Sequence, residues 1–173
     1  LTMEGTLFAF PIRGTDKEMT ISGAGNIKEL NKLEMLNVRD LTITKAEKIK
    51  SLNLAGSSRM ATLSLGNNKF LRELDCSNSY LLGTGENGQS LNLTNCRSLK
   101  EICIPESVSY LGNYVFSNNY ALTKVTLPNN ITEILEHTFL ACNSLIEIII
   151  PEGVKAIRYG AFSGCSNLSR VTI

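Results

Sequence analysis

The sequence predicts a right-handed solenoid of short parallel strands, with about 22–23 residues per repeat and little helix. Three observations lead to this fold class. Apolar positions recur at a fixed interval, each repeat contains two alternating apolar segments, and prolines follow several of these segments. A single repeat of this length cannot bury its apolar side alone, so successive repeats must stack and share one core.

The interval is clearest between residues 99 and 173. Leu99, Leu122, Leu145 and Leu168 are evenly spaced, and an isoleucine or valine follows each of them three positions later. Alternating apolar residues turn one side of a strand inward, and a following proline removes a backbone donor and ends the strand. Phenylalanine recurs at the same interval, and we expect these rings to form one buried column: Phe116, Phe139 and Phe162.

Each unit contains the pattern LxxLxLxxN/C twice, which predicts a leucine-rich-repeat solenoid. Upstream, Leu63 and Leu74 keep a step of half a unit. The step from Leu74 to Ile102 exceeds a whole unit, and the segment GTGENG at 83–88 supplies the additional residues. We therefore expect regular repeats over 49–173, in one continuous domain with a surface insertion at 83–88.

Residues 1–48 fit the pattern only loosely. The segments LTMEGTLFAF and EMTISG alternate in the manner of short strands. This region is either a set of degenerate repeats or an N-terminal cap. The chain ends at Ile173 within the pattern, so we expect a piece of a longer protein, truncated at its C-terminus. An open edge strand there would allow self-association.

Composition and motifs argue against several functions. The 17 basic and 16 acidic residues nearly balance, so the chain lacks the positive electrostatic field that would attract nucleic acid. The sequence contains no run of about 18 apolar residues, so we expect no membrane insertion. GTGENG satisfies GxGxxG, but a strand-like segment follows it where a nucleotide cofactor needs a helix. The only histidine, His137, shares its repeat position with Tyr114 and Gly160 and has no partner signature for a metal or a nucleophile. We expect no enzyme, no metal and no cofactor.

The cysteines occupy repeat positions. Cys96, Cys142 and Cys165 share the last position of LxxLxLxxN/C with Asn119, where a small group packs into the turn. Stacking places Cys142 and Cys165 about 4.8 Å apart, within reach of a disulfide, although we expect free thiols. Cys103 lies between two inward-facing residues and should point outward.

The outer face of the strands is the candidate binding surface. Opposite charges alternate along one row of this face, beside a second row of mixed character. Two interpretations stay open: exposed charges that support the stack, or a recognition surface. The first row is Glu101, Lys124, Glu147 and Arg170, and the second is Cys103, Thr126, Ile149 and Thr172.

The region from about 91 to 173 resembles the BspA-type leucine-rich repeat of bacterial surface proteins. The shared elements are a proline after the strand, a small residue before Phe162, and then Cys165 and Leu168. Asn119 and Val115 depart from the usual Cys and small residue. The resemblance implies a secreted or cell-surface setting and adhesion or protein binding. We expect a binding module that recognises a protein or glycan. The alternative is a structural repeat segment of a larger assembly, such as a surface stalk or a phage-tail-like component.

Overall fold

A computed structural model describes residues 2–4, 18–22, 38–44, 46, 49–80, 82 and 90–173. These residues contain short strands and no helix, as the sequence predicts. The strands are β1 (Thr2–Glu4), β2 (Glu18–Ser22), β3 (Asp40–Thr44), β4 (Ser51–Asn53), β5 (Thr62–Ser64), β6 (Glu73–Asp75), β7 (Leu91–Asn92), β8 (Glu101–Cys103), β9 (Lys124–Thr126), β10 (Glu133–Ile134), β11 (Glu147–Ile149), β12 (Ala156–Ile157) and β13 (Arg170–Thr172).

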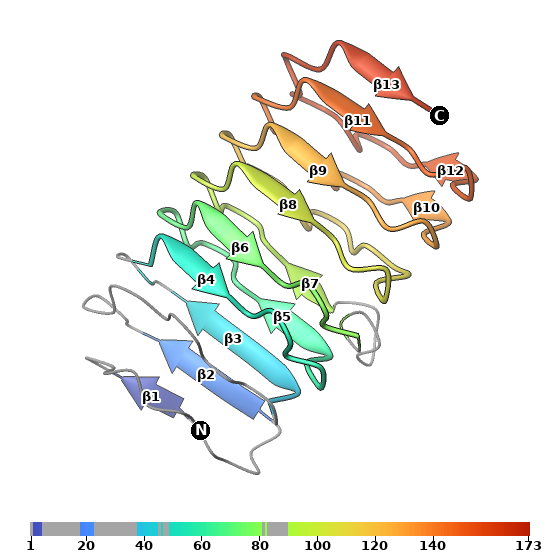
Figure 1. Cartoon of the computed structure of the whole chain (residues 1–173). Coiled ribbons are helices and arrows are strands. Elements are labelled where there is room, and N and C mark those ends of the chain that lie inside the picture. The colour runs from blue at the N-terminus through green and yellow to red at the C-terminus, as the bar shows by residue number, and fades with distance from the viewer. Residues whose placement is uncertain are drawn as a thin grey trace.

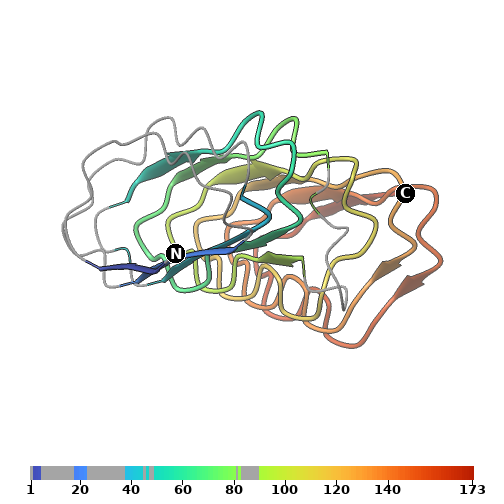
Figure 2. The same cartoon turned by 90° about the horizontal axis from the view of Figure 1, so that it is seen from below.

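The strands lie on two faces of a coil (Figure 1). We call the face with β4, β6, β8, β9, β11 and β13 the first strand face, and the face with the remaining strands the second strand face. The strands alternate between the two faces from β3 to β8 and again from β9 to β13, whereas β8 and β9 follow one another on the first strand face. Successive coils stack behind one another (Figure 2). The predicted leucine-rich-repeat solenoid is confirmed.

All strand pairs among the described residues are parallel, and their register follows the repeat. Leu41 pairs with Leu63, and Ile102 pairs with Val125, so that each inward residue lies beside its equivalent one coil later. The stacking predicted from the repeat is therefore present. Strands β1 and β2 pair in register with each other and with β3, within a five-stranded sheet that ends at β7.

The core consists of columns of equivalent apolar side chains. The ring centroids of Phe116 and Phe139 are 5.2 Å apart with 8° between the planes, and those of Phe139 and Phe162 are 5.2 Å apart with 2°. Phe116 and Phe139 are fully buried, and Phe162 is partly buried against the core. The predicted phenylalanine column is therefore present.

The first strand face is interrupted twice. Its strands form the hydrogen-bonded pairs β4–β6, β8–β9 and β11–β13, but no sheet joins β6 to β8 or β9 to β11. At the first interruption Leu74 is only partly buried, whereas Leu52 in the preceding strand is 1% exposed. The second strand face stays paired there, since Leu63 pairs with Leu91. The predicted insertion at 83–88 lies outside the described residues.

Turns between strands repeat a left-handed backbone conformation. Residues 67, 78, 95 and 118 adopt it, and all four are asparagines, which tolerate positive φ better than most residues. A second such position contains Tyr114, His137 and Gly160, with φ values of 61°, 54° and 62°. The side chains at this position differ, as the sequence predicts, but the three residues share a backbone conformation that was not predicted from the sequence.

Candidate functional site

The predicted binding residues form two exposed rows on the first strand face. All eight are exposed. In β8, β9 and β11 they alternate with a buried core residue, whereas Val171 in β13 is itself 49% exposed. Glu101 pairs in register with Lys124, and Glu147 with Arg170, so the expected neighbouring of opposite charges is present in both strand pairs. The structure therefore places the eight side chains on one surface.

One of these charge pairs forms an ion pair. The Arg170 guanidinium donates to the Glu147 carboxylate at 3.0 Å, and the two side chains are 74% and 51% exposed. Exposed pairs of this kind contribute about 0–1 kcal/mol to folding. This small contribution leaves both side chains available to a partner, because breaking the pair costs little.

Part of the predicted surface is hollowed. A depression of about 240 Å³ lies where β9 and β11 do not pair, and four of the eight predicted residues line it. Lys124 and Glu147 provide charge, and the Ile149 side chain beside them is an exposed apolar group, with 68% of its surface accessible. The four lining residues are Lys124, Thr126, Glu147 and Ile149.

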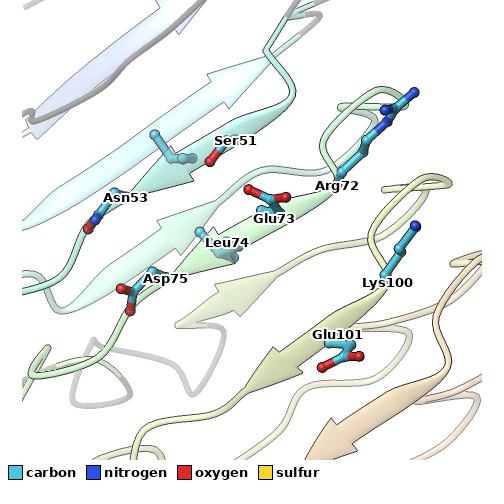
Figure 3. Close-up of a pocket in the computed structure, with 9 residues that line it drawn as sticks. Ser51, Asn53, Arg72, Glu73, Leu74, Asp75, Lys100 and Glu101 are labelled. Atoms are coloured by element: carbon cyan, nitrogen blue, oxygen red, sulfur yellow. The ribbon is translucent and has the colours of Figure 1, made fainter.

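A larger groove lies at the other interruption, between β6 and β8. Its volume is about 600 Å³, and its walls are formed by strands β4, β6 and β8. Figure 3 shows Arg72 and Lys100 at the starts of β6 and β8, with the carboxylates of Glu73, Asp75 and Glu101 farther along these strands. Charges of both signs therefore lie within one open groove.

This groove was not predicted from the sequence, and Glu101 is the only one of the eight predicted residues that lines it. The available signal was the long step from Leu74 to Ile102, which marks the coil where the register changes. An adjoining hollow of about 330 Å³ shares Leu74 and is lined by Tyr80 and Cys103. The Tyr80 side chain is 68% exposed, so the groove has an aromatic border.

His137 lies in an aromatic cluster at the edge of the coil. Its ring stacks on Tyr114 with centroids 5.0 Å apart, and Tyr159 contacts it edge-on at 5.5 Å. A side chain on Gly160 would overlap the His137 ring, so the glycine makes room for it. The cluster is a packing arrangement on an exposed turn, and Tyr159 is its most exposed member, at 80%.

The shared Asn/Cys position binds the backbone of the preceding coil. Asn119 Nδ2 donates to the Leu93 carbonyl at 3.0 Å, and the Sγ atoms of Cys142 and Cys165 donate to the Phe116 and Phe139 carbonyls at 3.1 and 3.0 Å. Burial raises the pKa of the Cys96 thiol, at the same position, to about 12. Each of these carbonyls also accepts a hydrogen bond from within its own turn, so the side chains add a second hydrogen bond that links one coil to the next.

The described residues contain neither a metal-binding group nor a membrane-spanning helix. No three or more His, Cys, Asp or Glu side chains among them are arranged to hold a metal ion. The described part of the chain also lacks any helix with the length and apolar character that crossing a membrane requires.

Comparison with known proteins identifies the repeat. The BspA type leucine rich repeat region matches residues 89–173 in six copies, and no curated protein sequence matches the chain. A leucine rich cell surface protein of Faecalibacterium prausnitzii is 25% identical, with a TM-score of 0.42 over 90% of this chain and 38% of its own. A leucine-rich repeat protein of Bacteroides ovatus is 21% identical, with a TM-score of 0.46 over 89% and 40%. The chain thus spans about two fifths of the length of these proteins.

Proposed function

The C-terminal half of the chain, residues 89–173, belongs to the BspA-type leucine-rich repeat family, and we propose that the chain is a non-enzymatic binding module. It recognises a protein or glycan through the first strand face, as part of a bacterial secreted or cell-surface protein. Family membership supports the setting. The side chains of the first strand face support the mode of action.

One observation supports binding above all. The groove between β6 and β8 and the depression between β9 and β11 occur where strands of the first strand face do not pair, and both are lined by exposed charged side chains. An extended surface with both charge signs and an exposed apolar group such as Ile149 can form hydrogen bonds and apolar contacts with one partner. The coil beneath is fixed by its stacked core, so such a surface needs little reorganisation on binding.

The experiment tests this face against the opposite one. We would screen the chain against an array of purified glycans and a panel of purified extracellular proteins. The double variant Glu147→Ala, Ile149→Asp should weaken binding to a positive probe about tenfold or more, which corresponds to about 1.4 kcal/mol. It should leave the circular dichroism spectrum unchanged, because both residues are exposed.

A matched control changes the other side of the coil. Glu133→Ala, Tyr159→Asp also removes the acid of an exposed ion pair, with Arg158, and replaces an exposed apolar side chain by aspartate. Its affinity for the same probe should equal that of the unaltered chain. Equal affinity of all three proteins, or a loss in the control alone, would exclude the surface between β9 and β11 as the binding face.

A further inference from the structure

The Asn/Cys column contains one place where two cysteines are neighbours. Each coil contributes one residue to this column, and Cys96 lies between two asparagines. Only Cys142 and Cys165 follow one another without an intervening asparagine. The column is, in order, Asn68, Cys96, Asn119, Cys142 and Cys165.

The coils approach closely at these two cysteines. Three residues before them, the Phe139 and Phe162 rings stack with centroids 5.2 Å apart and planes 2° apart. One residue before them, a Cβ atom on Gly164 would lie 3.2 Å from the Ala141 Cα atom. The two backbones are thus separated by about the 4.8 Å spacing of neighbouring strands, within the roughly 4.4–6.8 Å between Cα atoms that a disulfide spans.

The two thiols differ in accessibility and in acidity. Cys142 is fully buried, whereas Cys165 is partly buried. Once Cys165 is ionised, the Cys142 thiol can donate to it. This interaction lowers the pKa of Cys165 and raises that of Cys142, which burial raises further. Cys165 therefore forms the thiolate first and is the one that a reagent in solution reaches.

We propose that Cys142 and Cys165 are an oxidative modification site, which a low-molecular-weight disulfide converts to a disulfide joining two successive coils. The Cys165 thiolate attacks one sulfur of the reagent RSSR, forms a mixed disulfide and releases RS⁻. Cys142 then loses its proton and attacks the Cys165 sulfur, and the second RS⁻ leaves. The two cysteines lose two protons and two electrons, and RSSR is reduced to two RSH.

Forming this bond requires only a local change. Each Sγ atom now donates to a carbonyl of the preceding coil, at 3.1 Å from Cys142 and 3.0 Å from Cys165. Thiols are weak donors, so rotating them away from these carbonyls costs little. The resulting bond would tie together the coils that contain β11 and β13.

The test uses the folded chain of residues 1–173 with oxidised glutathione as the probe. Free thiols are alkylated after acid quenching and denaturation, and peptides are mapped by mass spectrometry. We expect the Cys142 and Cys165 peptides to be joined, which removes two of the five free thiols, with Cys96 still alkylated. A glutathione adduct on exposed Cys103 is identified separately by its own peptide. A Cys76→Ser, Cys103→Ser variant serves as the background for a second experiment. It removes the other two neighbouring cysteines, since Cys76 Sγ lies 3.7 Å from the Cys103 carbonyl oxygen.

Single variants test the order of the two steps. In the same background, Cys142→Ser should stop at a glutathione adduct on Cys165, and Cys165→Ser should leave Cys142 without an adduct. The proposal is overturned if the folded unaltered chain keeps five thiols while the chain unfolded in guanidinium oxidises. It is also overturned if Cys96 is joined to either cysteine as often as they are joined to each other. Mapping of the unaltered chain decides the matter even if a variant does not fold.

Discussion

Replacing Phe139 by alanine tests the stacked core directly. Its ring is fully buried between Phe116 and Phe162, at 5.2 Å from each centroid. Truncating a buried phenylalanine costs about 3–5 kcal/mol, and an aromatic pair adds about 0.5–1.5 kcal/mol beyond burial. Because the ring has partners on both sides, we expect the upper part of the range, about 4–5 kcal/mol.

The assay is thermal and urea unfolding followed by circular dichroism. For a chain of this size, 1 kcal/mol shifts the melting temperature by about 2–4 °C, so Phe139→Ala should lower it by about 8–20 °C. Coils of a solenoid can unfold separately, and hydrogen exchange of the amides in β9 and β11 would measure the loss locally.

Phe70→Ala is the matched control, because the Phe70 side chain is 50% exposed. We expect it to change stability by no more than about 0.5–1 kcal/mol. If Phe139→Ala costs no more than this control, the phenylalanine rings do not form the buried column, and the assignment of the core is wrong.

Four further predictions concern turns, the Asn/Cys column and thiols. Gly160→Ala should destabilise the chain by about 1–3 kcal/mol in urea unfolding, because its φ is 62° and a side chain would overlap His137. Adding His137→Ala should restore only the stability lost to this overlap and leave the loss caused by the positive φ. Asn68→Ala should cost about 1–3 kcal/mol, since its side chain bonds three buried backbone groups, and an unchanged urea midpoint would contradict this. Exposed Cys103 should react first with Ellman's reagent at neutral pH, whereas Cys96, whose pKa is raised from 9.0 to about 12, should stay protected. Folding keeps the Cys96 proton bound, so stability should decline as pH rises from 9 towards 12.

The repeat spacing is sufficient to predict the fold and the pairing of exposed residues. Side chains one repeat apart, such as Glu147 and Arg170, must become neighbours once the coils stack in register. The phenylalanine column follows in the same way. Both predictions depend only on the repeat length, which recurs at several apolar positions of the sequence.

The backbone conformation of individual turns cannot be predicted in this way. Tyr114, His137 and Gly160 share a left-handed position, although tyrosine and histidine favour other conformations. Only a glycine at this place suggests positive φ from sequence alone. The stacking of the His137 ring over the glycine is a contact between coils, and no local pattern encodes it.

The interruptions of the first strand face also escape prediction, for two different reasons. Between β6 and β8 the sequence shows a longer step, but it does not show whether the extra residues lie outside the coil or separate the strands. The spacing is the same on both sides of β9, which pairs with β8 and not with β11. Spacing therefore cannot distinguish the paired from the unpaired side.

These interruptions explain where a solenoid of this kind offers a ligand more than a flat surface. Coils that pair fully leave no gap between strands, because each inward side chain fills the space beneath its neighbour. A hollow needs a place where two coils fail to pair, and the grooves between β6 and β8 and between β9 and β11 occur at such places. The second strand face remains paired opposite the first groove, so it keeps the coils together while the first face opens. A repeat protein can in this way combine a rigid core with hollowed surfaces for binding, without an added domain.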